Sequence, residues 1–229
     1  MPFRAPLEAL IVPESGSETE SGRGCVSVLE LILTALAAAS SYLLGSVPSA
    51  LIAARLAGRP DPRTVGTGNA GSTNVALTVG TAAGIAVFLA DLLKGTVCGL
   101  AGLAIGGPLA GDLCVLAAVI GQIAPVFADF RGGKGAATTL GGYFGVAPAF
   151  ALLGLACWGI GLLTIRRGVI STVTAIVALA VVTVVLGEHQ LLGIGAAILT
   201  IAAHRTHLAQ WRRGEMPTIR EALRDNRRQ

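Results

Sequence analysis

Charged and aromatic residues are scarce in this sequence, and their scarcity excludes an ordinary water-soluble domain. Only 13% of its 229 residues are charged and 4% are aromatic, whereas 53% are hydrophobic. The mean hydropathy of +0.72 is typical of a chain that crosses a lipid bilayer. The 31 glycines follow no Gly-X-Y period, which excludes collagen, and the long apolar runs exclude a disordered low-complexity chain.

Cysteine is rare as well, and its placement excludes a disulfide framework or a zinc site. The four cysteines, Cys25, Cys98, Cys114 and Cys157, lie far apart, without a Cys-x-x-Cys pair or a neighbouring histidine. We expect them to be packing residues. An outer-membrane barrel is also excluded, because residues 169–186 are an almost unbroken apolar run rather than an alternating strand.

Seven apolar stretches predict an all-α, polytopic membrane protein with a seven-span helical bundle. The fourth stretch is short and rich in glycine, so it is either half-buried or re-entrant. Pairs of small residues four apart, such as Gly141 and Gly145, favour close helix packing in lipid. The predicted spans are residues 28–54, 79–105, 113–127, 135–147, 149–165, 169–187 and 191–203.

Positive charge predicts the orientation of the bundle. Fourteen of the 17 lysines and arginines fall on one side, in segments 55–63, 131–134, 166–167 and 205–228. By the positive-inside rule this side is cytoplasmic, so the N-terminus faces out and the C-terminus faces the cytoplasm. Residues 1–25 make a poor signal peptide and are expected to be a disordered leader. Residues 26–208 form the membrane domain, and residues 209–229 form a basic cytoplasmic tail.

Two polar loops on the predicted cytoplasmic side contain residues that can bind an anion. Residues 63–74 are rich in glycine, asparagine and hydroxyl groups, which can present several donors to one anion. The second loop reads Arg131-Gly132-Gly133-Lys134-Gly135, where glycines allow close backbone approach and Lys134 adds a charge beside a helix start. Each loop alone is equally compatible with a simple turn, and the second is not a Walker A motif. Their shared side favours a phosphate-bearing ligand from the cytosol.

Polar groups within the spans are candidates for either structure or function. Asp91 and Lys94 lie three residues apart in the second span and can pair on one helical face. Such a pair either stabilises the bundle or marks a site. Ser46 and Pro48 interrupt the first span near its cytoplasmic end, where the proline frees a backbone carbonyl.

Histidines and hydroxyls mark the remaining cytoplasmic ends of spans. His204 and His207 lie one turn apart at the end of the last span, too far in sequence from further ligands to indicate a metal site. His204 is either a general base or phosphate partner, or a histidine favoured by the helix dipole. Ser171 and Thr172 follow the Arg166-Arg167 pair at the start of the sixth span.

In order and spacing these motifs resemble the PlsY-type acyl-phosphate:glycerol-3-phosphate acyltransferases of bacteria. That family transfers a fatty acyl group from acyl phosphate to the 1-hydroxyl of glycerol 3-phosphate, giving lysophosphatidate and phosphate. The resemblance implies a multi-pass enzyme of phospholipid synthesis in the bacterial cytoplasmic (inner) membrane. Its partners are acyl phosphate, glycerol 3-phosphate and membrane lipid, with no cofactor, metal or nucleic acid. The matched segments are Gly45-Ser46-Val47-Pro48, residues 61–74, residues 91–95, Pro125-Val126-Phe127, residues 132–135 and His204-Arg205.

The resemblance also implies the residues of the site. His204, Lys134 and Asn69 are expected to be catalytic. Acyl phosphate is an activated mixed anhydride, so positioning and charge stabilisation suffice without a covalent enzyme intermediate. The residues expected to bind substrate phosphate are Ser46, Arg63, Gly66, Thr67, Gly68, Asn69, Gly71, Asn74, Gly132, Gly133, Lys134, Gly135, Ser171 and Thr172.

Several positions depart from the family pattern. Thr67 and Ser72 are mild changes. The pattern has arginine, histidine, asparagine and glutamate at four other positions, and the missing arginine removes one bidentate phosphate partner. Two alternatives therefore stay open: a divergent or inactive paralogue with another phosphate-bearing acceptor, and a small anion transporter, although transporters concentrate polar groups near the midplane. The four positions are Leu77, Gln122, His207 and Met216.

Overall fold

The computed structural model describes residues 27–214, and this part of the chain is helical without strands. The predicted leader at residues 1–25, most of the predicted tail and Met216 lie outside the described residues. The predicted tail boundary at residue 208 falls inside the last helix. The helices are α1 (Val28–Gly45), α2 (Ser49–Leu56), α3 (Ser72–Thr78), α4 (Thr81–Ile123), the short 3-10 helix η1 (Val126–Ala128), α5 (Ala136–Val146), α6 (Pro148–Ile165), α7 (Gly168–Leu186) and α8 (Gln190–Arg212).

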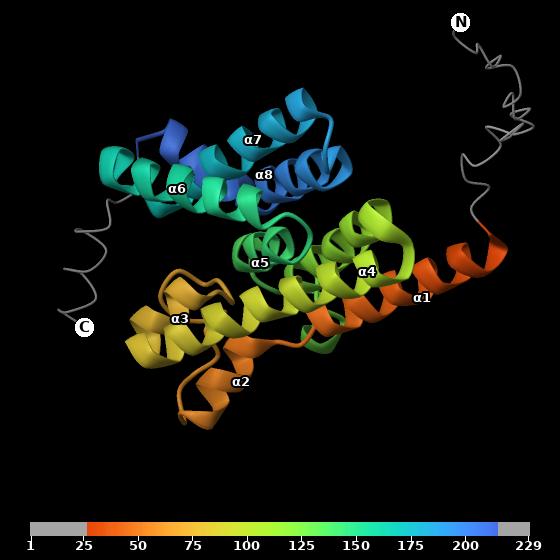
Figure 1. Cartoon of the computed structure of the whole chain (residues 1–229). Helices are drawn as coiled ribbons and strands as arrows, with labels where there is room; N and C mark the ends of the chain where they lie inside the picture. Colours follow the sequence, from red (N-terminus) through yellow and green to blue (C-terminus); the bar gives the residue numbers. More distant parts are fainter. Residues whose placement is uncertain (1–26, 215–229) are drawn as a thin grey trace, which may run out of the picture.

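The helices form two layers with α5 between them. Figure 1 shows α1 to α4 on one side and α6, α7 and α8 on the other. Large apolar side chains face outward from both layers; Leu93 of α4 and Leu163 of α6, for example, are 60% and 79% exposed. Five helical stretches of the described part are long and apolar enough to cross a membrane: 28–56, 81–128, 148–165, 168–186 and 190–212. An apolar exterior of this kind suits a bundle surrounded by lipid rather than water.

Helix α4 is a hairpin rather than one straight helix. Its 43 residues would extend to roughly 65 Å, about twice the hydrocarbon thickness. The backbone leaves helical geometry at Gly106 and Gly107, where Gly107 has a φ of 69°. The two arms pack back on each other, with Gly102 against the backbone of Ala110 and Gly111. The predicted second and third spans are therefore the antiparallel arms of α4.

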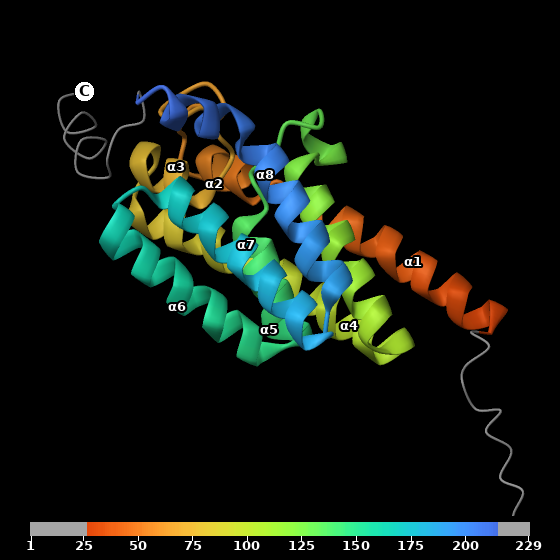
Figure 2. The same ribbon diagram turned by 90° about the horizontal axis from the view of Figure 1, so that it is seen from above.

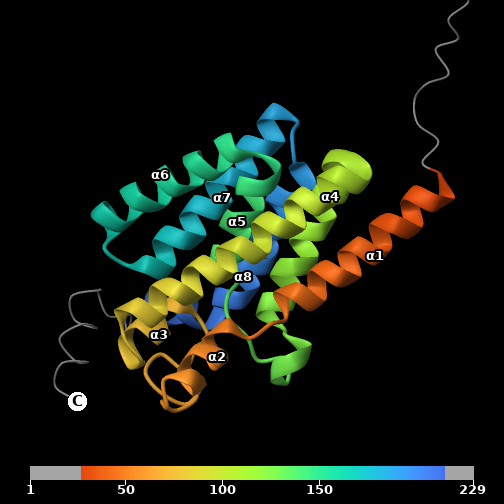
Figure 3. The ribbon, with the colours of Figure 1, turned by 60° about the horizontal axis from the view of Figure 1, so that its bottom comes forward.

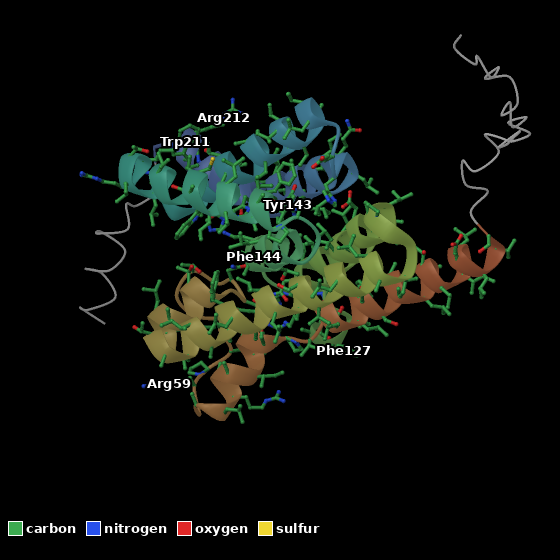
Figure 4. The ribbon with its side chains drawn as sticks, viewed as in Figure 1. Arg59, Phe127, Tyr143, Phe144, Trp211 and Arg212 are labelled. Carbon is green, nitrogen blue, oxygen red and sulfur yellow. The ribbon has the colours of Figure 1, made fainter. Side chains whose placement is uncertain are left out.

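Small residues allow α5 to fit between the layers. A side chain at Gly141 or Gly95 would overlap the backbone of the facing helix, because α4 and α5 touch at these glycines. Thr96 Oγ1 donates a 2.9 Å hydrogen bond to the Gly141 carbonyl at the same contact. With only 11 residues, α5 reaches roughly 16 Å. It therefore corresponds to the short, glycine-rich stretch, and Figure 4 shows Tyr143 and Phe144 on it between the layers.

The predicted interruption of the first span is confirmed. Helix α1 ends at Gly45 and α2 begins at Ser49, with Pro48 between them. The buried Ser46 hydroxyl donates to the Tyr42 carbonyl at 2.8 Å. The predicted Asp91–Lys94 ion pair is also confirmed, with 2.9 Å between Lys94 Nζ and Asp91 Oδ1.

The polar connections gather at one end of the bundle. Figures 2 and 3 show α2, α3, the segment after α4 and the C-terminal end of α8 together, opposite the kink of α4. The turns joining α5 to α6 and α7 to α8 lie at the kink end. At that end His189 Nδ1 and Asp112 Oδ1 are 2.6 Å apart. The two anion-binding loops predicted from the sequence thus meet at one end.

Candidate active site

The first loop is organised around the side chain of Asn74. Asn74 is 1% exposed, and its Nδ2 donates to the carbonyls of Pro62, Asn69 and Val65 at 2.6, 3.0 and 3.1 Å. Its Oδ1 accepts a 2.8 Å hydrogen bond from the Thr67 N–H. Both ends of this amide are thus engaged within the loop, so Asn74 shapes the segment that presents Thr67 and Asn69.

Two glycines make the turn at the tip of this loop. Gly66 and Gly68 have φ angles of 59° and 68°, in the left-handed region that favours glycine. A Cβ at Gly66 would also overlap Asn74 Oδ1. The tip, including Thr67, is exposed, while Asn69 is half-buried. The loop therefore combines a rigid base with an accessible tip.

Arg63 joins the first loop to η1, the 3-10 helix that precedes the second loop. Its Nη2 is 2.7 Å from Asp61 Oδ2, and its Nη1 donates to the Ala128 carbonyl at 2.9 Å. Hydrogen bonding from Arg63 lowers the pKa of Asp61, which keeps this carboxylate charged. The guanidinium thus holds the segments around residues 63 and 128 side by side.

The glycines of the second loop pack against protein backbone. The N–H groups of Gly132 and Gly133 donate to the carbonyls of Ile123 and Gln122 at 3.1 and 2.9 Å, which satisfies carbonyls at the end of α4. A Cβ at Gly133 would lie 2.9 Å from the Ala70 carbonyl oxygen, so the two loops touch here. Gly135, with a φ of 75°, is the N-cap of α5.

Lys134 and two histidines of α8, His204 and His207, form a group that we call the Lys134 cluster. Lys134 Nζ is 3.3 Å from His207 Nε2. Its positive charge interacts electrostatically with the rings of both His204 and His207. Burial lowers the pKa of Lys134 to about 8. His207 is absent from the predicted site, although its one-turn spacing from His204 on a helix was a signal that could have identified it.

The geometry of His204 determines which ring nitrogen is available. His204 is 3% exposed, and its Nδ1 lies 2.8 Å from the Thr200 carbonyl oxygen. A carbonyl only accepts, so Nδ1 carries the proton and a neutral ring has its lone pair on Nε2. This arrangement is the one that a general base requires.

Three predicted hydroxyls have their hydrogen bonds within the bundle. Ser46 lies in the break between α1 and α2, as described above. Ser171 is buried against Gly161 of α6 and bonds the Arg167 carbonyl at 3.1 Å. Thr172 Oγ1 accepts a 3.2 Å hydrogen bond from Trp158 Nε1. Within the described part of the chain, none of these three hydroxyls hydrogen-bonds Lys134.

An apolar cavity of about 460 Å³ lies between the two layers. Residues of α3, the first arm of α4, α5, α6 and α7 line it, and Thr172 stands on its wall. Ser72 and Thr73 belong to the first loop, where α3 begins, and Ala136 directly follows the second loop. The cavity therefore connects apolar space between the helices with both loops. Its lining includes Ser72, Thr73, Ala76, Ile85, Phe88, Ala136, Ala137, Leu140, Tyr143, Gly154, Leu155, Trp158, Thr172, Ala175, Ile176 and Leu179.

Known proteins with the same sequence pattern and fold share one activity in their names. Residues 35–214 match the glycerol-3-phosphate acyltransferase family. Glycerol-3-phosphate acyltransferase of Thioalkalivibrio sulfidiphilus is 40% identical over 193 residues, covering 82% of this chain and 95% of that protein. The enzyme of Synechococcus elongatus is 34% identical, covering 87% of this chain and all of that protein.

Solved structures agree with these relatives. The crystal structure of PlsY, an integral membrane glycerol 3-phosphate acyltransferase, in its glycerol 3-phosphate form has a TM-score of 0.77 and 33% identity, covering 81% of this chain and 95% of that one. Its lysophosphatidic acid form has a TM-score of 0.75 and 32% identity, covering 83% and 98%. The chain is thus an integral membrane acyltransferase and belongs to the glycerol-3-phosphate acyltransferase family.

Proposed function

We propose that this protein transfers a fatty acyl group from acyl phosphate to the 1-hydroxyl of glycerol 3-phosphate, giving lysophosphatidate and phosphate. The observation that carries the proposal is the meeting of the first loop, Lys134 and the α8 histidines at the end of the bundle where the apolar cavity reaches the loops. Both substrates carry phosphate, and the donor also carries a long apolar chain. The site offers the Lys134 cluster for the phosphate groups and the cavity for the apolar chain.

Phosphate binding is assigned to Lys134 and to the tip of the first loop. Lys134 supplies the ammonium, and the Thr67 hydroxyl and the Asn69 side-chain amide supply donors from the loop held by Asn74. Gly68 shapes the tip of this loop, because its N–H donates to the Val65 carbonyl at 3.0 Å. Arg63 is paired with Asp61 and holds the first loop against η1 through its bond to Ala128. Preorganised donors in a partly dry site stabilise negative charge at little reorganisation cost.

The acyl chain is assigned to the cavity between the layers. Its walls are mainly apolar, and the residues around Ser72 and Ala136 connect it to the loops. A fatty chain there would leave the carbonyl carbon near the Lys134 cluster. Burying methylene groups contributes about 0.8 kcal/mol each, so the tail can supply much of the donor's binding energy.

In the transfer step, one C–O bond forms and one breaks. The 1-hydroxyl oxygen of glycerol 3-phosphate bonds to the acyl carbonyl carbon, and the bond from that carbon to the phosphate oxygen breaks. His204 Nε2 accepts the hydroxyl proton, because its Nδ1 proton is held by Thr200. The proton leaves with phosphate. Lys134 stabilises the charge that develops on the departing phosphate.

The membrane arrangement we propose has seven crossings in the bacterial cytoplasmic membrane. The crossings are α1 with α2, the two arms of α4, then α5, α6, α7 and α8. The N-terminus faces out and the loop end faces the cytoplasm, as the distribution of arginine and lysine requires. A reporter fused after Gln229 that works only in the cytoplasm checks the orientation: activity supports it, and silence with normal expression contradicts it.

The deciding experiment is phosphate release from acyl phosphate by purified protein in lipid, with each substrate omitted in turn. Release should require glycerol 3-phosphate, and Lys134→Met should abolish most of it. Arg59→Gln is the matched control, because it removes one exposed cation at the same end. Release that ignores glycerol 3-phosphate, or that survives Lys134→Met at the wild-type rate, contradicts the proposal. Counterflow of labelled glycerol 3-phosphate across vesicles would support transport instead.

A further inference from the structure

A buried polar junction lies beneath the two loops, at the break between α1 and α2. We call it the Gln122 junction; it consists of Ser49, Asp91, Lys94 and Gln122. Asp91, Lys94 and Gln122 are only 4%, 7% and 7% exposed. Lys94 Nζ contacts Asp91 Oδ1 at 2.9 Å and Gln122 Oε1 at 3.3 Å. Gln122 Nε2 donates to Asp91 Oδ2 at 2.9 Å, so the amide bridges both partners of the ion pair.

The junction also holds the break in the first span. Lys94 Nζ donates to the Val47 carbonyl at 2.6 Å, and the Ser49 hydroxyl donates to Asp91 Oδ1. Ser49 is the first residue of α2, and α2 leads directly into the loop that contains Arg63. The start of the first loop is therefore anchored to the same charged pair as Gln122.

Gln122 in turn contacts the segment that carries Lys134. Its carbonyl accepts the Gly133 N–H at 2.9 Å, and its Nε2 would lie 3.3 Å from a Cβ at Gly133. Gln122 is also one residue from the end of α4 at Ile123. The last carbonyls of a helix have no partner within the helix, so the loop that caps them follows any movement of the helix end.

On the basis of the proposed function, we propose that Gln122 is a positioning residue, whose buried amide fixes the end of α4 and thereby places Lys134 for phosphate binding. Gln122 itself need not touch substrate. Its amide hydrogen-bonds Asp91 and Lys94 on the other arm and so fixes the end of α4. The bond from the Gly133 N–H to the Gln122 carbonyl then holds the adjacent Lys134 in place. Without the amide, Asp91 Oδ2 loses its donor, and a buried polar atom without a partner is unfavourable.

A second buried polar contact, between Asp112 and His189, separates this role from general stabilisation. Asp112, on the second arm of α4, contacts His189 Nδ1 at 2.6 Å and accepts from the Leu192 N–H at 3.3 Å. It lies near the kink, at the opposite end from Lys134. Asp112→Asn should therefore lower the midpoint of thermal unfolding without moving the Lys134 loop.

The test compares Gln122→Leu, Gln122→His and Asp112→Asn in lipid. Leucine keeps similar volume without hydrogen bonds, whereas histidine can donate to Asp91 from one nitrogen and accept from Lys94 at the other. Gln122→Leu should raise KM for glycerol 3-phosphate about tenfold, with a smaller change in kcat, and should speed hydrogen–deuterium exchange in the segment around Gly133. Gln122→His should restore both measurements, and Asp112→Asn should change neither.

Equal effects of Gln122→Leu and Asp112→Asn on KM, or unchanged exchange around Gly133 in Gln122→Leu, would overturn the positioning role. If Gln122→Leu does not fold, Gln122→Glu takes its place, because it keeps the shape and the acceptor for Lys94 but lacks the donor to Asp91. Exchange needs no turnover. If the purified protein has no transferase activity, the proposed function is wrong, and the exchange measurement still tests the role of Gln122.

Discussion

The charge on Lys134 should set the alkaline limit of catalysis. Burial lowers its pKa to about 8 from an ordinary value of 10.5. The protonated ammonium is the form that attracts phosphate, so its contribution is complete below about pH 8 and is lost as pH rises through this value. kcat/KM for glycerol 3-phosphate should therefore fall about tenfold per pH unit above pH 8. An unperturbed lysine would keep its charge to about pH 10.

The size of the fall follows from the strength of one charged contact. A hydrogen bond to a charged group contributes roughly 1.5–3 kcal/mol, which corresponds to roughly 10- to 150-fold in kcat/KM. The fall should level off at the activity of Lys134→Met, which lacks the ammonium at every pH. Bound phosphate favours the charged lysine, so the alkaline limb of kcat should lie at higher pH than that of kcat/KM.

The assay is phosphate release from acyl phosphate between neutral pH and about pH 10, with spontaneous hydrolysis subtracted from samples without glycerol 3-phosphate. Lys134→Arg is the matched variant, because a guanidinium stays charged across this range. It should retain activity and lose the limb near pH 8. A limb that stays at the same pH in Lys134→Arg, or a wild-type profile that remains flat to pH 10, would refute the assignment of the charge to Lys134.

Three further predictions concern packing, the loop tether and the cavity. Gly141→Ala should lower the free energy of unfolding by about 1–3 kcal/mol, because its Cβ would overlap the Leu92 backbone. Gly159→Ala is the control, since a Cβ there meets open space. Equal unfolding midpoints of the two variants in detergent would contradict the packing role of Gly141. Arg63→Lys keeps the charge but not the fork that reaches both partners, so KM for glycerol 3-phosphate should rise about tenfold; an unchanged KM would exclude a tethering role. Ala175→Leu narrows the cavity, so kcat/KM for a long-chain acyl phosphate should fall relative to kcat/KM for a short-chain donor. If the acyl chain binds elsewhere, the ratio of the two kcat/KM values stays at its wild-type value.

The sequence by itself determined the class of the protein and much of its helical arrangement. Apolar runs of span length must avoid water, and backbone groups in lipid must bond within helices, so hydropathy alone predicts an all-helical membrane fold. The break at Ser46–Pro48 and the Asp91–Lys94 pair could also be predicted from local sequence. Proline cannot continue a helix, and residues three apart share a helical face. The order of the polar motifs was sufficient to indicate the family.

Tertiary structure decided what each polar residue does. Asn74 was predicted to bind phosphate. Its amide instead donates to the carbonyls of Pro62 and Val65, whose positions depend on how the loop folds. The contacts of Gln122 with Lys94 and of His207 with Lys134 likewise span 28 and 73 residues of sequence. Spacing predicts neighbours within one helix, but contacts between distant segments depend on how the helices pack, and that packing brought Lys134 to α8.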